Sequence, residues 1–389
     1  MNNWELKKLS ELGTVVGGAT PSTKNEEYYN GEIPWITPKD LSSFSGRYIK
    51  RGERNITQLG FENCSTYLMP PKSILFTSRA PIGYIAISSN EICTNQGFKS
   101  IIPHENTDYL FLYYLLKYNK EKIESMGSGT TFKEVSGNVM KNIEVCVPSD
   151  KFEQEKIASI LNCLDEKIEL NNKINDNLEQ MAQAIFKSWF IDFEPWGGTI
   201  PEDWREGSIY ALMDVIYGAP FKSTLFNSDK NGYPLIRIRD LKTFLPQLYT
   251  PEVLPKMTIV KAGDVLVGMD AEFRPCIWQG ETGVLNQRVC KIVPKRSISR
   301  FYVYATLKPY LEFIEFYKTG TTVSHIGKAD FDKIQITIPS ETVLNDFSKL
   351  IEPLYLQILN NSDENSRLVI LRDNLLPRLM SGELSVADI

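Results

Sequence analysis

The chain has 389 residues, a hydrophobic fraction of 42% and a formal net charge of −5. This length exceeds one ordinary core and predicts two or more domains. No apolar run approaches the roughly 18 residues of a membrane span, and the N-terminus MNNWELKKLSELG lacks a secretory signal, so we expect a cytoplasmic protein. The six cysteines form no CxxC pair and there are only two histidines, which argues against a disulfide framework or a metal site.

Residues 1–149 have the pattern of a mixed α and β domain. The runs SILFTS at 73–78 and YIAIS at 84–88 are bounded by Gly, Pro and Asn and predict strands. The run YLFLYYLLKYNKEKIESM at 109–126 has helical spacing, and GTTFKEVSGNVMKNIEVCVPS at 129–149 closes the segment. Many short strands with a helix near the end favour an α+β fold.

Residues 150–196 predict one long helix. No Gly or Pro occurs up to Phe193, and apolar residues recur in alternating steps of four and three over 33 residues. This heptad pattern predicts a seam about 50 Å long against which a second helix can pack. Asn171 and Asn175 occupy seam positions near its middle.

Residues 197–340 repeat the first domain. GTTVSHIGKADFDKIQITIPS at 320–340 echoes 129–149 at an offset of 191, and this register extends back without gaps to Asn95 over Asn286. Further upstream the offset is 200, where IPWITPKDLSSF meets YPLIRIRDLKTF. The runs DVLVGM and IQITIP predict strands, and SRFYVYATLKPYLEFIEF predicts a helix. The repeat therefore predicts a second α+β domain of the same kind.

Residues 341–389 repeat the long helix at an offset of 190, with Asn361 and Asn365 at the seam positions of Asn171 and Asn175. A buried Asn in a heptad seam lowers stability but fixes register. We predict that the two helices form an antiparallel coiled coil in which Asn171 and Asn175 meet Asn365 and Asn361. The alternative is a seam that is simply solvated at its middle. Two tandem domains with such helices would form a pseudo-twofold body, with the domains at opposite ends of a rod.

The negative net charge is confined to the predicted helices. Residues 150–196 carry 5 basic and 10 acidic residues and 341–389 carry 4 and 8, whereas 1–149 carry 16 and 15 and 197–340 carry 18 and 15. The globular copies are therefore the candidate surfaces for an anionic ligand. Because neutralisation of phosphates supplies most non-specific affinity, so small a basic excess predicts weak DNA binding without a basic partner.

Candidate nucleic-acid contacts fall on loops between the predicted strands. Arg can make two bonds to guanine, amides suit adenine, and Gly-Thr-Thr turns can contact phosphate. In the first copy the candidates are Thr37, Lys39, Arg79, Asn95, Gln96, Gly129, Thr130, Thr131 and Lys133. In the second copy they are Arg237, Arg239, Arg274, Asn286, Gln287, Arg288, Thr321, Thr322 and Lys328. We expect Arg237 and Arg239 on one strand face, and Arg79 and Arg274 in comparable places after a strand. Solvated surface or turn capping is the alternative for each residue.

The sequence lacks the motifs of common nucleic-acid enzymes. There is no Walker phosphate loop, no GxGxxG that opens a helix after a strand, and no [DN]PP[FY] motif. Asp150 with DEK at 165–167 loosely resembles a nuclease site, but the second copy has LQI at 356–358 in that place. We therefore expect a non-catalytic protein without a metal or cofactor of its own.

A tandem of variable domains, each closed by a GTT…IPS segment and followed by a long helix, resembles the specificity subunit of type I restriction-modification systems. FEQEKIASILNCLDEKIELNN and AIFKSWFIDFEP match that family's central conserved region, and LRDNLLPRLMSGEL matches its C-terminal one. The resemblance covers essentially the whole chain. It implies target recognition domains at 1–149 and 197–340 and spacer helices at 150–196 and 341–389.

The resemblance further implies that each recognition domain reads one half of a bipartite site in double-stranded DNA, with the helices setting the unspecified gap. It implies two methyltransferase subunits and two restriction subunits that supply adenine methylation, translocation and cleavage. Aromatic residues near the end of the first long helix are candidates for docking the methyltransferase, with domain core as the alternative: Phe186, Trp189, Phe190, Phe193 and Trp196. Competing hypotheses are a stand-alone nuclease or methyltransferase and an RNA-binding scaffold.

Overall fold

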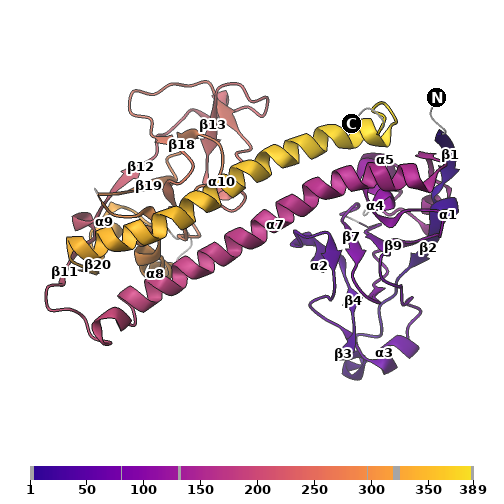
Figure 1. The fold of residues 1–389 in the computed structure, drawn as a ribbon, viewed down its shortest axis with the longest axis horizontal. Helices are drawn as coiled ribbons and strands as arrows, with labels where there is room; N and C mark the ends of the chain where they lie inside the picture. The colour runs from indigo at the N-terminus through magenta and orange to yellow at the C-terminus, as the bar shows by residue number, and fades with distance from the viewer. Residues whose placement is uncertain (1–3, 80, 130–132, 296, 319–324, 387–389) are drawn as a thin grey trace. The chain divides into compact units, whose positions relative to one another are not determined.

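The computed structural model describes residues 4–79, 81–129, 133–295, 297–318 and 325–386. The chain divides into two compact units: unit 1 comprises Met1–Glu169 and Leu368–Ile389, and unit 2 comprises Leu170–Arg367. The two long helices α7 (Lys151–Phe190) and α10 (Glu341–Met380) each contribute a segment to both units (Figure 1).

Unit 1 is built of short strands with helices packed against them. Its strands are β1 (Trp4–Lys8), β2 (Gly13–Gly17), β3 (Tyr29–Ile33), β4 (Trp35–Ile36), β5 (Tyr48–Ile49), β6 (Ile74–Phe76), β7 (Ile85–Ser88), β8 (Cys93–Thr94), β9 (Lys99–Pro103) and β10 (Glu144–Pro148). Its shorter helices are α1 (Leu9–Leu12), η1 (Glu26–Tyr28), α2 (Pro38–Ser42), α3 (Gln58–Glu62), α4 (Tyr109–Tyr118), α5 (Lys120–Ser125) and α6 (Gly137–Asn142).

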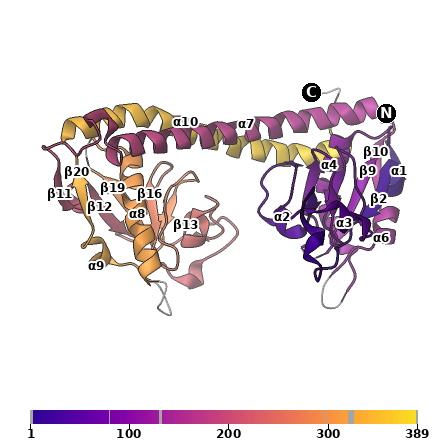
Figure 2. The same ribbon diagram turned by 90° about the horizontal axis from the view of Figure 1, so that it is seen from below.

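Unit 2 follows the same plan, and its strands and α8 lie on one side of the long helices (Figure 2). Its strands are β11 (Arg205–Ser208), β12 (Met213–Tyr217), β13 (Tyr233–Ile236), β14 (Tyr249–Thr250), β15 (Ile259–Val260), β16 (Val265–Gly268), β17 (Pro275–Ile277), β18 (Gly283–Leu285), β19 (Val289–Pro294) and β20 (Gln335–Ile338). Its shorter helices are η2 (Glu194–Trp196), η3 (Ile209–Ala211), η4 (Ser223–Leu225), η5 (Ile238–Leu241), α8 (Arg300–Lys318) and α9 (Lys328–Phe331).

Strand pairing repeats between the units. The order β2-β9-β6-β7 in unit 1 matches β12-β19-β16-β17 in unit 2, and the pair β1-β10 matches β11-β20. In addition, β4 pairs in parallel with β8, as β13 does with β18. The predicted α+β fold in two copies is therefore confirmed.

The long helices complete the core of each unit. In unit 1, Leu161 of α7 and Leu379 of α10 are fully buried in one cluster with the sheet residues. In unit 2, Phe347 and Ile351 of α10 are fully buried together with Ala182 of α7. The apolar seam of each helix allows it to pack against both the partner helix and the strands of a sheet.

One predicted helix is divided. The run at 109–126 forms α4 and α5, with a break at Asn119, whose side-chain amide donates to the Leu115 carbonyl at 2.8 Å. An Asn side chain that bonds to the backbone in this way competes with continuation of the helix. The corresponding run in unit 2 forms the single helix α8.

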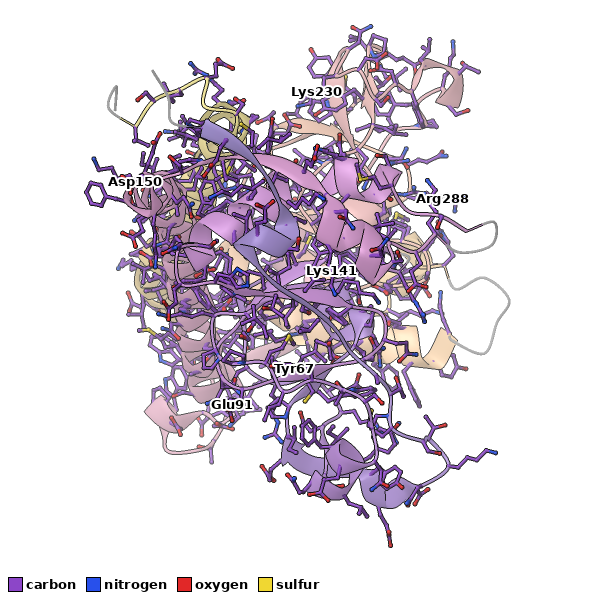
Figure 3. All side chains as sticks on the ribbon, turned by 90° about the vertical axis from the view of Figure 1, so that its right-hand side faces the viewer. Tyr67, Glu91, Lys141, Asp150, Lys230 and Arg288 are labelled. Carbon is purple, nitrogen blue, oxygen red and sulfur yellow. The ribbon has the colours of Figure 1, made fainter. Side chains whose placement is uncertain are left out.

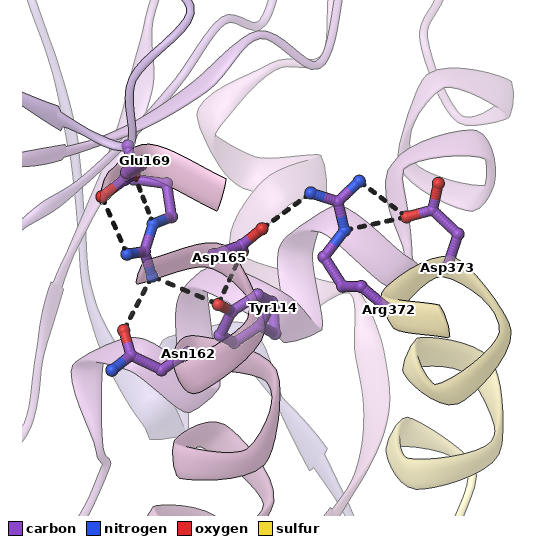
Figure 4. Close-up of polar contacts among 7 residues, drawn as sticks. Tyr114, Asn162, Asp165, Glu169, Arg372 and Asp373 are labelled. Atoms are coloured by element: carbon purple, nitrogen blue, oxygen red, sulfur yellow. Dashed lines mark hydrogen bonds and ion pairs between the residues drawn. The ribbon is translucent and has the colours of Figure 1, made fainter. Parts of the chain in front are cut away.

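A buried polar network ties the loop after α2 to the long helices (Figure 4). Arg47, only 5% exposed, donates to both carboxylate oxygens of Glu169 at 2.7 and 3.1 Å, and it lies 3.3 Å from the Tyr114 hydroxyl. Tyr114 donates in turn to Asp165, which accepts from Arg372 of α10, both at 2.7 Å. Residues of the loop, α4, α7 and α10 are thus joined by charge-assisted bonds within unit 1.

Candidate nucleic-acid interface

The candidate loops meet where two parallel strands end. In unit 1 the Asn95 N–H donates to the Ile36 carbonyl at 3.0 Å, and in unit 2 the Asn286 N–H donates to the Ile236 carbonyl at 3.1 Å. Parallel strands end at the same sheet edge, so the loop that begins at Thr37 lies beside the turn at Asn95. The equivalent loops of unit 2 lie together in the same way.

The first of these loops begins with a capped helical turn. The Thr37 N–H and hydroxyl donate to Asp40 Oδ2 at 2.7 and 2.6 Å. In unit 2 the Arg237 N–H donates to Asp240 Oδ2 at 2.9 Å, and Arg237 Nε lies 3.6 Å from the same oxygen. The prediction that Arg237 and Arg239 share a strand face is wrong, because β13 ends at Ile236 and Arg239 lies in η5. Asp240 caps this turn by accepting from the Arg237 N–H.

The second loop is a tight turn held by an asparagine. Asn95 Oδ1 accepts from the Gly97 N–H at 2.9 Å, and Asn286 Oδ1 accepts from the Arg288 N–H at 3.2 Å. These side-chain oxygens therefore stabilise the turns, as the alternative of turn capping proposed. The following glutamines are exposed, although the Thr20 hydroxyl donates to Gln96.

A glycine in each unit lets a third segment approach this turn. A Cβ at Gly18 would lie 2.1 Å from the Thr94 carbonyl oxygen, and a Cβ at Gly218 would lie 2.0 Å from that of Asn286. No side chain fits at such distances. The next residue, Ala19, is hydrogen-bonded to the end of β8, because its N–H donates to the Thr94 carbonyl oxygen at 3.1 Å.

The fourth and fifth segments pair across a short bridge. In unit 1 Arg79 is bridged to Glu134, and Arg79 Nε lies 2.9 Å from the Glu134 carboxylate. In unit 2 the bridge joins Asp270 to His325. The residue that corresponds to Arg79 is therefore Asp270 and not Arg274. Sequence reasoning missed Asp270, Glu134 and His325, although the offset of 191 aligns both bridged pairs.

Further candidates belong to the two Gly-Thr-Thr segments or follow them in the sequence. Thr130, Thr131, Thr321 and Thr322 lie outside the described residues. Gly129 has φ of 132°, a conformation that glycine adopts easily, and Lys133 is exposed.

Three of the candidate cations lie near carboxylates. Lys39 lies 2.7 Å from Glu53 and Lys328 lies 2.8 Å from Asp332. Arg274, 69% exposed, lies 4.0 Å from Glu315. Solvated ion pairs of this kind contribute little to stability, so a phosphate can replace the carboxylate at low cost.

The four seam asparagines are brought together in the predicted pairs. Asn171 Nδ2 donates to Asn365 Oδ1 at 2.9 Å and to Glu364 at 2.7 Å, and Asn361 Nδ2 donates to Asn175 Oδ1 at 2.8 Å. Asn171 and Asn361 are 1% and 5% exposed, so this part of the seam is buried rather than solvated. The pairs run antiparallel within unit 2.

The aromatic residues near the end of α7 pack within unit 2. The Phe190 ring lies 4.8 Å from that of Phe347 and 4.9 Å from that of Tyr302, and Phe193 lies 5.9 Å from Trp204. Phe186 and Trp189 also contact Phe347, and Trp196 contacts both Trp189 and Trp204. Phe186, Trp189 and Phe190 thus pack against the core of unit 2. Beside them lies a cavity of about 470 Å³, whose lining includes Phe186, Phe190, Ile191 and Tyr310.

Among the residues that the structure describes, no group of three or more His, Cys, Asp or Glu side chains is placed to hold a metal ion. None of the helices found there is both long and apolar enough to cross a membrane.

Two copies of one α+β domain, each with the same loops gathered at one edge, define a tandem recognition protein. The family model for the type I restriction modification DNA specificity domain matches residues 1–180 and 201–360. The chain belongs to this family, and its role is in DNA sequence specificity. The resemblance found in the sequence is thereby confirmed.

Relatives match along the whole chain. The type I restriction enzyme MjaIX specificity subunit of Methanocaldococcus jannaschii is 36% identical, over 100% of this chain and 95% of that protein. The type I restriction enzyme HindI specificity subunit of Haemophilus influenzae is 24% identical, over 99% of this chain and 100% of that protein. The crystal structure of the S subunit of a type I restriction-modification system from M. genitalium shares the fold, with a TM-score of 0.60 and 16% identity over 97% of this chain and 96% of that one.

Proposed function

We propose that this chain reads a bipartite site in double-stranded DNA, one part with each unit, and directs type I methyltransferase and restriction subunits to it. The observation that carries this proposal is that equivalent loops meet at one sheet edge in both units but present different side chains. Thr37 stands where unit 2 has Arg237, and Gly97 where it has Arg288. An identical framework with different contact residues suits the reading of two different base sequences.

In this proposal the recognition domains are residues 1–149 and 197–340, and the segments 150–196 and 341–389 are the spacer that sets the gap. Two methyltransferase and two restriction subunits supply the chemistry, and the chain itself is non-catalytic and acts in the cytoplasm, where it meets DNA. The small basic excess of the recognition domains supports a requirement for partners, because phosphate neutralisation by this chain alone is limited.

The test is to co-express the chain with a type I methyltransferase subunit from the same operon and to map methylated adenines by single-molecule sequencing. We expect a split motif with a fixed unspecified gap. A contiguous motif would contradict the bipartite reading. Methylation or cleavage of DNA by the purified chain alone, with S-adenosylmethionine or magnesium, would favour the stand-alone enzyme.

We further propose that the cavity beside Phe186 and Phe190 docks the methyltransferase. Two residues of its rim, Ile191 and Tyr310, are 57% and 37% exposed. We expect Ile191→Glu and Tyr310→Ala to weaken association with the methyltransferase by about tenfold or more, as for central interface residues, without changing the melting temperature. Association is measured by titration with purified methyltransferase.

The matched control is Ile216→Glu, which changes an apolar residue of unit 2 that is 40% exposed but lies away from this cavity. It should leave association unchanged. Phe190→Ala is uninformative by itself, because loss of its core contacts costs about 3–5 kcal/mol of stability. Normal association of both rim variants would remove the docking assignment.

A further inference from the structure

Three residues from separate segments of unit 2 form a polar chain at the candidate interface. Arg288 follows the turn after β18, Asp270 follows β16, and His325 lies just before α9. Arg288 Nη1 lies 3.3 and 3.2 Å from the two Asp270 carboxylate oxygens, and His325 Nδ1 lies 2.7 Å from Oδ1. The aspartate is thus held between the imidazole and the guanidinium.

Backbone pairing fixes these positions independently of the side chains. The Met269 N–H donates to the Arg288 carbonyl at 2.9 Å, and the Ile326 N–H donates to the Met269 carbonyl at 2.9 Å. Asp270 and His325 face each other across the bridge between their segments. The side chains therefore project from a rigid frame, which favours a defined orientation of the guanidinium.

Unit 1 has the same frame with a different set of side chains. The equivalents of Asp270 and His325 are Arg79 and Glu134, which form an ion pair of reversed polarity at 2.9 Å. The equivalent of Arg288 is Gly97, where a Cβ would lie 2.9 Å from Pro38 Cγ and 3.0 Å from Asn95 Oδ1. A side chain at this position of unit 1 would therefore force Pro38 or Asn95 to shift, whereas unit 2 carries Arg288 there.

The Arg288 guanidinium has more N–H donors than its contact with Asp270 uses. Its side chain is 55% exposed, whereas that of Asp270 is 24% exposed, and Arg288 lies at the surface of unit 2 (Figure 3). Among the described residues, the guanidinium contacts Asp270 through Nη1. Arginine has five N–H donors in a planar fork that matches O6 and N7 of guanine, so one edge can be held by a carboxylate while another contacts the base.

We propose that Arg288 reads a guanine in the half-site bound by unit 2, and that Asp270, oriented by His325, is its positioning residue. This inference rests on the proposed function of bipartite DNA recognition. It predicts that the two half-sites differ in how they are read, since unit 1 has glycine in place of the arginine.

The test uses the chain in complex with its methyltransferase and duplexes that carry the mapped motif. Replacement of one guanine in one half-site should weaken binding of the unsubstituted complex by about 10- to 100-fold. Arg288→Ala should bind the original and replaced duplexes equally, and Asp270→Asn should reduce the discrimination at that same base pair. Discrimination at all other positions should be unchanged.

This double comparison separates base reading from structural damage, because misfolding would weaken binding to every duplex alike. A bipartite motif with no guanine in either half-site, or Arg288→Ala that keeps full discrimination at every guanine, would overturn the inference while leaving the proposed function intact. Lack of a split motif for the unsubstituted complex would instead reject the proposed function. Lys349→Ala on α10, an exposed residue that forms an ion pair with Asp346, is the control for expression and assembly.

Discussion

Replacing Asp165 with alanine is expected to lower the free energy of unfolding of unit 1 by about 3–5 kcal/mol, the usual cost of removing one partner from a buried ion pair. Asp165 is 5% exposed and accepts from Arg372 and from the Tyr114 hydroxyl, both at 2.7 Å. Without it, the hydroxyl loses its acceptor and a guanidinium that is 15% exposed loses its buried partner. Urea denaturation followed by tryptophan fluorescence and circular dichroism measures the loss.

The exposed pair of Lys349 and Asp346 provides the matched control, since a solvated pair contributes roughly 0–1 kcal/mol. A loss from Asp165→Ala no larger than that from Lys349→Ala would mean that water screens the network in solution.

Unit 2 shows that the same fold forms with apolar residues at two positions of this polar network. At the offset of 190, Asp165 corresponds to Tyr355 and Arg372 corresponds to Ala182, and both of these belong to the apolar cluster of unit 2. Replacement of a buried ion pair by well-packed apolar residues is often neutral or stabilising. In unit 1 the polar network includes Arg47, so it also holds the loop that follows α2 against α4 and α7.

The seam asparagines should give effects of opposite sign in single and multiple variants. Asn171→Leu alone should lower the free energy of unfolding by about 1–3 kcal/mol, because it leaves Asn365 Oδ1 and Glu364 without their buried donor. Leucine at all four positions removes both members of each pair and should raise stability by about 1 kcal/mol or more. Thermal unfolding of the single and quadruple variants measures both.

The register function of these residues is tested by the state of association of the quadruple variant. An all-apolar seam no longer distinguishes one register or partner from another, so we expect new oligomers in light scattering. A monomeric quadruple variant whose crosslinks between α7 and α10 keep the original register would show that the asparagines do not specify the pairing.

Several features were determined by the sequence alone. The two-copy organisation follows from exact offsets, because a repeated chain must repeat its core pattern. The long helices follow from a heptad seam free of Gly and Pro, and the antiparallel pairing follows from Asn positions near the middle of each helix. Local periodicity and position along the chain carry this information without any knowledge of tertiary contacts.

The tertiary structure alone decided which loop residues meet and what each one does there. Asp240 caps a turn where a strand face was predicted, and the asparagines of the Asn-Gln pairs hold their own turns. Arg79 and Asp270 are each bridged to a segment more than 50 residues away in the chain. Side-chain partners of this kind depend on distances between segments that are remote in the chain, and no local pattern encodes those distances. The repeat predicted two units of the same kind, but only the fold showed that Arg79 and Glu134 in unit 1 face each other as Asp270 and His325 do in unit 2.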